Sequence, residues 1–328
     1  MQILNQGVCM KFRKTLLVAV LSAFSITAFS QDKIQNVAIT AIVDHPALDS
    51  IRKGVIEELE REGFVDGKNI KIDYQSAQGS TATAAQIARK FVGDKADIII
   101  PITTPSAQPV VAATRSIPIV FSGVTDPVAA KLVKSWEPSG TNVTGISDHK
   151  PIAPQVKLIQ TLVPELKSVG YVYSAGEVNS TIVLEELKEE AKKQGFNVVP
   201  VAVQRSADIG TAARSLNGKV QAIYISEDNG VVSAYEALHK AALEAKIPVI
   251  ASDRDTVERG ALAAYAVNQY DIGVATGKSA ARVLKGEKAG LIPTQEVSQL
   301  ELSINTKTAK DLGINLPQDL LKEAKETF

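Results

Sequence analysis

Residues 117–120 read Ile-Pro-Ile-Val, and residues 247–250 read Ile-Pro-Val-Ile, 130 positions further along the chain. A second repeated pair, Gly63-Phe64 and Gly195-Phe196, is separated by 132 positions. Gly-Phe and Ile-Pro occur at the ends of elements in many α/β proteins, so either pair alone would be weak evidence. Two nearly equal offsets favour an internal duplication, in which both halves of the chain have the same order of elements.

Both halves alternate short β-branched apolar runs with amphipathic segments of helical length. This alternation is typical of βαβ units and a parallel sheet. In the first half we expect strands at 37–43, 70–74, 98–102 and 119–122, and helices at 48–62, 81–92 and from about 105. In the second half we expect strands at 168–173, 198–203, 222–226 and 249–252, and helices at 181–194, 207–216 and 231–245.

The chain after Ala261 departs from this alternation, with a predicted strand at 262–267, a long helix at 272–284 and a strand-like stretch at 297–304. A segment that crosses back between the halves would form part of a hinge. We therefore predict an α/β protein with two Rossmann-like, doubly wound parallel-sheet lobes joined by a multi-strand hinge. The expected N-terminal lobe is 31–148 plus about 269–290, and the expected C-terminal lobe is 149–268 plus about 291–328.

The N-terminus has the features of a secretory signal peptide. Basic residues, an apolar run and small residues at the −3 and −1 positions follow one another as Lys11, Arg13 and Lys14, then 16–26, then Ala28 and Ser30. The apolar run is shorter than the roughly 20 residues that a membrane-spanning helix needs. We expect residues 1–30 to be removed by cleavage near Ser30 and Gln31 and the mature protein to be periplasmic, whether translation starts at Met1 or Met10.

Composition narrows the possible functions. The only cysteine, Cys9, precedes the cleavage site, which excludes disulfides, cysteine catalysis and thiolate metal sites from the mature chain. Removing the three basic leader residues from a balance of 36 basic and 36 acidic residues leaves a net charge of −3 and no indication of nucleic acid binding. No strand-to-helix turn carries a GxGxxG, GxxxxGK[ST] or GxSxG motif. We therefore expect no enzymatic activity, no cofactor and no metal.

Ligands of open parallel sheets bind beyond the carboxyl ends of the strands, where the following helices diverge. The loops at these ends are rich in hydroxyl and carboxylate groups, at 44–46, 103–108, 122–127, 174–180, 226–230 and 252–255. Ser, Thr and Asp are also the preferred N-caps of helices, so any one of them is weak evidence. Six such loops that meet at one cleft would favour a binding site.

This mixture of groups suits a zwitterion. Thr104 and Ser106 at a helix start can hold a carboxylate, and one loop acid can hold an ammonium group. The candidate acids are Asp126, Glu227, Asp228 and Asp253. Charged hydrogen bonds contribute roughly 1.5–3 kcal/mol each, whereas micromolar affinity needs about 8 kcal/mol beyond the cost of immobilisation. An apolar side chain must therefore be buried as well, and an amino acid meets both demands.

At these loops the chain resembles the periplasmic substrate-binding proteins of ABC importers, of the tryptophan- and tyrosine-binding type. The resemblance rests on residues 45–49 (HPALD), 63–64 (GF) with 67–69 (GKN), 125–128 (TDPV), 142–145 (NVTG), and 304–305 (IN) with 312–314 (LGI). It implies a type I periplasmic-binding-protein fold that closes by a hinge around a small ligand. An amino acid, aromatic in some members, is the implied ligand, and an ABC permease in the membrane is the implied partner of a monomeric protein.

The resemblance and the loop positions together assign ligand contacts to both lobes. From the N-terminal lobe we expect His45, Thr104, Ser106, Ala107, Gln108, Ser122, Thr125 and Asp126. From the C-terminal lobe we expect Asn179, Asp228 and Asp253. His45 has an alternative role as a surface or capping group. Two other functions remain open at this point, a ligand-sensing module for a membrane signalling receptor and an exported α/β enzyme that uses Asp126, Asp228 or Asp253.

Overall fold

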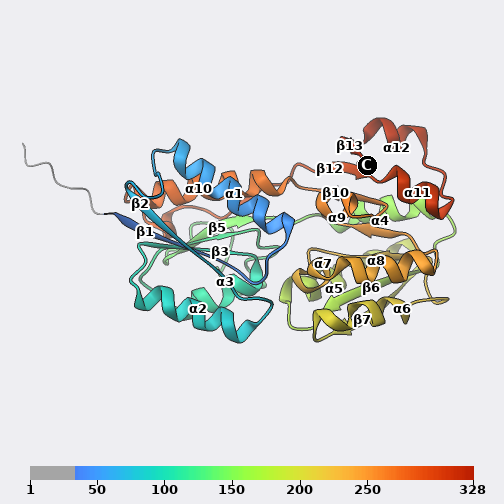
Figure 1. Ribbon diagram of the computed structural model, residues 1–328, viewed down its shortest axis with the longest axis horizontal. Coiled ribbons are helices and arrows are strands. Elements are labelled where there is room, and N and C mark those ends of the chain that lie inside the picture. The colour runs from blue at the N-terminus through green and yellow to red at the C-terminus, as the bar shows by residue number, and fades with distance from the viewer. Residues whose placement is uncertain (1–33) are drawn as a thin grey trace, which may run out of the picture. The chain divides into compact units, whose positions relative to one another are not determined.

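A computed structural model of the protein describes residues 34–328 (Figure 1). The predicted signal peptide, residues 1–30, lies outside these residues. Two sheets organise the described chain, and each has helices on both faces. The predicted doubly wound, two-lobed architecture is therefore confirmed. Within residues 34–328, no helix combines the length and the apolar character needed to cross a membrane.

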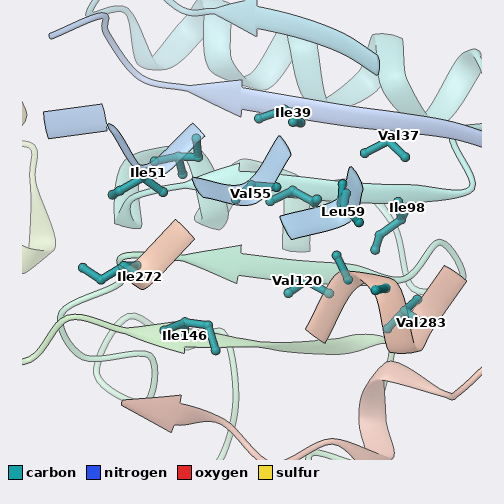
Figure 2. Packing of buried hydrophobic residues seen from close by; sticks show 14 of the residues in the cluster. Val37, Ile39, Ile51, Val55, Leu59, Ile98, Val120, Ile146, Ile272 and Val283 are labelled. Atoms are coloured by element: carbon teal, nitrogen blue, oxygen red, sulfur yellow. The ribbon is translucent and has the colours of Figure 1, made fainter. Parts of the chain in front are cut away.

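The first sheet is parallel throughout, with strand order β11-β5-β4-β3-β1-β2. Its strands are β1 (Gln35–Ala41), β2 (Ile70–Ser76), β3 (Ile98–Ile102), β4 (Ile119–Ser122), β5 (Val143–Ser147) and β11 (Gln295–Glu296). One face carries α1 (Pro46–Arg61) and α10 (Gln269–Leu284), and the other carries α2 (Thr81–Gly93) and α3 (Thr104–Ala113). Figure 2 shows the apolar layer between this sheet, α1 and α10. We call this sheet and its helices the N-terminal lobe.

The second sheet has the order β13-β12-β10-β9-β8-β6-β7, and only the β10–β12 pair is antiparallel. Its strands are β6 (Ser168–Ser174), β7 (Asn197–Val203), β8 (Ala222–Tyr224), β9 (Val249–Ala251), β10 (Ala263–Ala266), β12 (Glu301–Ile304) and β13 (Glu326–Thr327). One face carries α4 (Ile152–Leu162), α5 (Val178–Gln194), α11 (Thr306–Leu312) and α12 (Gln318–Glu323). The other carries α6 (Ile209–Arg214), α7 (Asn229–Ser233), α8 (Tyr235–Glu244) and α9 (Arg254–Glu258). This sheet and its helices form the C-terminal lobe.

The central strands are buried on both faces, which explains their continuous apolar sequence. Ile98, Ile99 and Ile100 of β3 are all fully buried. Ile98 and Ile100 contact the layer of α1 and α10, whereas Ile99 contacts the layer of α2 and α3. The alternation of side chains along a strand thus serves two apolar layers at once.

The chain passes between the lobes three times, between β5 and α4, between β10 and α10, and between β11 and β12. Helix α10 therefore belongs to the N-terminal lobe although it follows the second lobe in the chain. The predicted strand-like stretch at 297–304 forms a strand only at its end, as β12, which pairs with β10, whereas β11 precedes the stretch and pairs with β5. The last crossing follows Glu296, a few residues beyond the expected position near 290.

Other elements also differ from the expectation, and α9, α11, α12 and β13 were not predicted. Strand β5 and helix α4 were not predicted, because β5 contains Thr144 and Gly145 and the first turn of α4 contains Pro154. Gly145 is nevertheless required in this strand, since a Cβ atom there would lie 2.3 Å from the carbonyl oxygen of Phe121. The single helix predicted at 231–245 is divided into α7 and α8.

Helices α1 and α10 approach each other closely at glycines. A Cβ atom on Gly54 would lie 2.3 Å from the carbonyl oxygen of Tyr270, and one on Gly273 would lie 2.1 Å from that of Ile51. The same helices are joined at one end by the hydroxyl of Tyr270, which donates to Glu57 Oε2 at 2.6 Å. This contact fixes the returning helix to the first lobe.

We expect a Gly273→Ala substitution to lower the free energy of unfolding by about 1–3 kcal/mol, the usual cost of overpacking. The reason is the clash of the added methyl group with the backbone of α1. Urea denaturation measures the change. Gly93→Ala is the matched control, because a Cβ atom at this helix end meets nothing within 4 Å. Equal losses in both variants would contradict the close packing of α1 and α10.

Candidate functional site

The strand order reverses between β1 and β3 in the first sheet and between β6 and β8 in the second. Loops at such a reversal diverge and leave a crevice for a ligand. Residues that follow these four strands, together with residues that follow β4, β5 and β9, line one pocket of about 390 Å³.

The N-terminal lobe contributes a row of side chains whose order follows the sheet. Because β5, β4, β3 and β1 are successive neighbours, Asp148, Thr125, Thr104 and His45 follow one another along the pocket. Neighbouring strands lie about 4.8 Å apart, so the ends of β5 and β1 are separated by about 14 Å. Asp148 and His45 therefore line opposite ends of this wall.

Apolar groups line the region between these ends. Ala47, Leu48 and Ile51 come from the first two turns of α1, and Val232 comes from α7 of the other lobe. Gly123 adds backbone without a side chain, and a Cβ atom there would lie 3.2 Å from Ile51 Cδ1. Part of a ligand that fills this pocket must be apolar.

Two helices of the N-terminal lobe, α1 and α3, begin at the pocket. The first N–H groups of a helix lack intrahelical partners and attract anions. His45 and Thr103 occupy the N-cap positions, yet neither side chain caps its helix. Thr103 has φ of 69°, and backbone strain of this kind in a β-branched residue is concentrated at functional sites. These helix starts can hold a carboxylate.

Four side chains that line the pocket carry buried polar atoms without a hydrogen-bond partner in the described part of the chain. These atoms are Asp148 Oδ1, Asn179 Oδ1, Thr103 Oγ1 and both ring nitrogens of His45. An unpaired buried polar group costs about 1–3 kcal/mol, and folded proteins contain few of them. Their concentration in one pocket indicates that a ligand supplies the partners.

A buried ion pair lies beside the pocket and joins the lobes. Lys150, in the first crossing, donates to a carboxylate oxygen of Glu227 and to the carbonyl oxygen of Asp148 at 3.1 Å. Gln269, at the start of α10, donates to the other oxygen of Glu227 at 2.5 Å. Although burial opposes its charge, the nearby carboxylate of Glu227 raises the pKa of Lys150. Two crossing segments are thus tied to one loop of the C-terminal lobe.

A second pocket of about 330 Å³ shares part of its lining with the first. The shared residues are Thr125, Asp148, Asn179 and Glu227. The second pocket adds Lys150 and Ser252, whose hydroxyl oxygen has no partner within residues 34–328. The polar end of the site therefore continues past Asp148 into a charged region.

His45 is uncharged at neutral pH. Burial lowers the pKa of its imidazole from 6.5 to about 4, although the carboxylates of Asp253 and Asp44 favour the charged form and the guanidinium of Arg259 opposes it. A neutral imidazole has one N–H donor and one nitrogen acceptor. Asn229 can bond one of them, and the other is available to a ligand in this pocket.

Five of the eleven predicted site residues line the pocket: His45, Thr104, Thr125, Asn179 and Asp253. Asp253 also caps α9, because its carboxylate accepts hydrogen bonds from the backbone nitrogen of Thr256 at 2.8 Å and from its hydroxyl at 2.6 Å. The loops of both lobes therefore meet at one pocket, as the sequence predicts.

Four predicted site residues of the N-terminal lobe do not line the pocket. Ala107 packs in the apolar layer with α2, and Ser106 is buried outside the pocket lining. The hydroxyl of Ser122 pairs with that of Thr276 at 2.7 Å. Gln108 donates to the carbonyl oxygen of Ala130 at 3.3 Å. Ser106, Ala107 and Gln108 belong to α3 and Ser122 to β4, and none of the four lines the pocket.

The carboxylates of the other two predicted acids accept hydrogen bonds from backbone nitrogens of their own loops. Asp126 accepts hydrogen bonds from the backbone nitrogens of Val128 and Ala129 at 2.9 Å each. Asp228 is fully buried and caps α7, and it also accepts from Ser174 and Ser180. Asp228 lies outside the pocket lining, whereas its neighbours Glu227 and Asn229 are part of it.

The sequence analysis did not assign Asp148, Lys150 or Gln269 to the site. Asp148 and Lys150 follow β5, which was not predicted, and Gln269 begins α10 three residues before the predicted helix start. Asn268 caps this helix by accepting from the backbone nitrogen of Tyr270 at 2.9 Å, a signal that the sequence contains. Asp148 had no comparable signal until β5 was recognised as a strand.

A family model described as "ABC transporter substrate binding protein" matches residues 36–328. The tyrosine-binding protein of Clostridioides difficile (strain R20291) is 42% identical over 294 residues, which cover 89% of this chain and 85% of that protein. A crystal structure of an ABC domain in complex with L-Trp from Streptococcus pneumonia is 36% identical, with a TM-score of 0.87 over 90% of this chain and 100% of that one.

A ligand-free, open substrate binding protein from Clostridium difficile is 40% identical, with coverage of 89% and 99% of the two chains. Its TM-score is 0.67, below the 0.87 of the L-Trp complex, although its sequence identity is higher. The present structure therefore resembles the ligand-bound relative more than the open one. This agrees with a pocket lined from both lobes.

Because Glu227 would be buried without its cation, we expect Lys150→Met to lower the free energy of unfolding by about 3 kcal/mol. Adding Glu227→Gln should recover part of this loss, since the amide needs no counter-charge and can still accept from Gln269. Thermal and urea denaturation of both variants and the parent measure the difference. A double variant no more stable than Lys150→Met would contradict the pairing.

Proposed function

The chain belongs to the ABC transporter substrate binding protein family, and we propose that the solute it binds for an ABC importer is an amino acid. Family membership implies a small-molecule ligand and a permease partner. The named relatives support the ligand class, since one is a tyrosine-binding protein and another was crystallised with L-Trp. The chemistry of the pocket supports it independently.

The observation that carries the proposal is the free carboxylate oxygen of Asp148, buried beside an apolar wall and along the same edge as two helix starts. An ammonium group is the natural partner of this oxygen. The N-terminus of α3, at Thr103 and Thr104, can accept the ligand's carboxylate. Leu48 and Ile51 then contact the ligand's side chain. A zwitterion with an apolar side chain satisfies all three features.

Binding and closure are coupled in this proposal. A ligand held by Asp148 and Thr104 in one lobe completes its contacts with Asn179 and Asn229 only when the other lobe is near. Such a ligand binds the closed state more tightly and shifts the population towards it. The crossings between the lobes are the segments that would bend.

We further propose that the protein is exported to the periplasm after cleavage near Ser30, acts as a monomer and catalyses no reaction. The last point is supported by the acids considered for an enzyme. Asp126, Asp228 and Asp253 all accept hydrogen bonds from backbone nitrogens at the ends of their own loops. They are positioned as structural caps.

Calorimetry with the twenty amino acids tests the ligand class, and small-angle scattering tests closure. We expect at least one amino acid to bind with micromolar affinity or better and to reduce the radius of gyration. No binding tighter than millimolar across the panel would overturn the proposal.

Asp148→Asn should weaken the affinity for the bound amino acid about 10- to 150-fold, as expected for the loss of a charged hydrogen bond of roughly 1.5–3 kcal/mol. Asp126→Asn is the matched control, because its carboxylate lies outside the pocket lining. Calorimetry on both variants makes the comparison. An equal loss in both would show that Asp148 does not hold the ammonium group.

Affinity should also fall as the pH decreases from 6.5 to 4. In an open form the exposed imidazole of His45 has an ordinary pKa near 6.5, whereas in the closed structure it is about 4. At His45 the closed form thus binds fewer protons, so this group favours opening in acid by up to about tenfold per pH unit in this window, whereas Glu227, whose pKa is raised by burial, acts in the opposite direction. Titrations at several pH values should show this slope in the parent and lose it in His45→Gln, whereas parallel curves would contradict the linkage.

A further inference from the structure

Beyond the recognition of an amino acid, one residue in the pocket has an unassigned role. His45 is nine-tenths buried, lines the pocket, and has no hydrogen-bond partner for either ring nitrogen among the residues described. The two ordinary roles of a lone histidine do not fit, because His45 is neither on the surface nor bonded to the first turn of α1. Asn229 of the opposite lobe lies close enough to bond one of these nitrogens, so at least the other one requires a partner from outside the protein.

The nearest charged group of the opposite lobe does not supply that partner. Both carboxylate oxygens of Asp253 accept hydrogen bonds from Thr256, at 2.8 and 2.6 Å. Asp253 acts on His45 through its charge. Since burial keeps the imidazole neutral, it offers one donor and one acceptor of ordinary strength.

The position of His45 decides which part of the ligand it meets. Asp148, after β5, and His45, after β1, lie at opposite ends of the N-terminal wall, about 14 Å apart at the backbone. Leu48 and Ile51 lie on the helix that starts beside His45. An amino acid with its ammonium group at Asp148 would extend its side chain along these residues towards the imidazole.

We propose that His45 determines specificity by hydrogen-bonding the far end of the ligand's side chain, so that the protein selects aromatic amino acids with an O–H or N–H donor there and rejects phenylalanine. This inference rests on the proposed function, because it assumes an amino acid in the pocket. A site built to bond a substrate hydroxyl leaves its own polar groups unpaired when the analogue lacks it. The phenyl ring would leave a nitrogen of His45 buried and unsatisfied.

The test is calorimetry with L-tyrosine, L-tryptophan and L-phenylalanine on the parent protein, His45→Leu and His45→Gln. In the parent we expect phenylalanine to bind at least about 100-fold more weakly than the better of the other two. In His45→Leu this ratio should fall below about tenfold, because the apolar side chain no longer needs a partner. His45→Gln, which retains a donor and an acceptor, should keep an intermediate ratio.

Circular dichroism and thermal melting establish that each variant is folded, and Asp148→Asn serves as the comparison variant. It should weaken all three amino acids by similar factors, because the ammonium group is common to them. Phenylalanine binding as tightly as tyrosine and tryptophan to the parent, or an unchanged ratio in His45→Leu, would overturn the role of His45 and leave the amino-acid proposal intact. Failure of every amino acid to bind the parent would overturn both.

Discussion

The contact between α1 and α10 is the constraint on which the organisation of this protein depends. The first lobe is completed by a helix that follows most of the second lobe in the chain, and the two helices meet backbone to backbone at Gly54 and Gly273. Larger residues at either position would hold α10 away from the sheet. Because α10 must return to this place, the chain has to cross between the lobes more than once, and the crossings run beside the ligand pocket.

This routing brings the hinge and the pocket into contact. Glu227 belongs to the loop after β8, accepts from Lys150 in the first crossing and accepts from Gln269 at the end of the second. The same loop continues to Asn229, which lines the pocket. Replacing a buried ion pair with apolar residues is often neutral for stability, so its value lies elsewhere. Here the ion pair, together with Gln269, holds both crossings in one position relative to the loop after β8. A protein that closes around a ligand needs such a defined arrangement in its closed state.

The sequence predicted the architecture well because the architecture follows from periodicity. Buried parallel strands such as β3 read as apolar runs, and helices such as α1 carry their apolar residues on one face, so both are visible in one dimension. Strand β5 was hidden, since Gly145 satisfies a local requirement of packing against Phe121 and Thr144 donates to the carbonyl oxygen of Ile292, and neither follows an apolar pattern. Because β5 was not recognised as a strand, Asp148 was not seen to follow the end of a strand, and it was therefore not considered as a site residue.

Individual site residues were harder to predict, because the residue types that cap helices are also those that bind ligands. The loop after β8 lies at the pocket, but its most conspicuous acid, Asp228, accepts hydrogen bonds from its own loop and from Ser174 and Ser180. The neighbouring side chains of Glu227 and Asn229 line the pocket instead. Asp228 and Glu227 are adjacent in the chain, yet the first carboxylate caps a helix and the second lines the pocket. Residue type alone does not distinguish these two roles.

Saturation with hydrogen bonds separates Asp126 and Asp228 from three residues that line the pocket, Asp148, Asn179 and His45. Asp126 and Asp228 have their hydrogen bonds completed by the backbone and by serine hydroxyls, and they are fixed before any ligand arrives. Asp148, Asn179 and His45 keep buried polar atoms that the described chain does not satisfy. Each such atom makes the closed arrangement less favourable by itself, which favours opening without a ligand. In the proposed mechanism a ligand that satisfies all of them removes that cost, so the same unpaired atoms would both select the ligand and make closure depend on it.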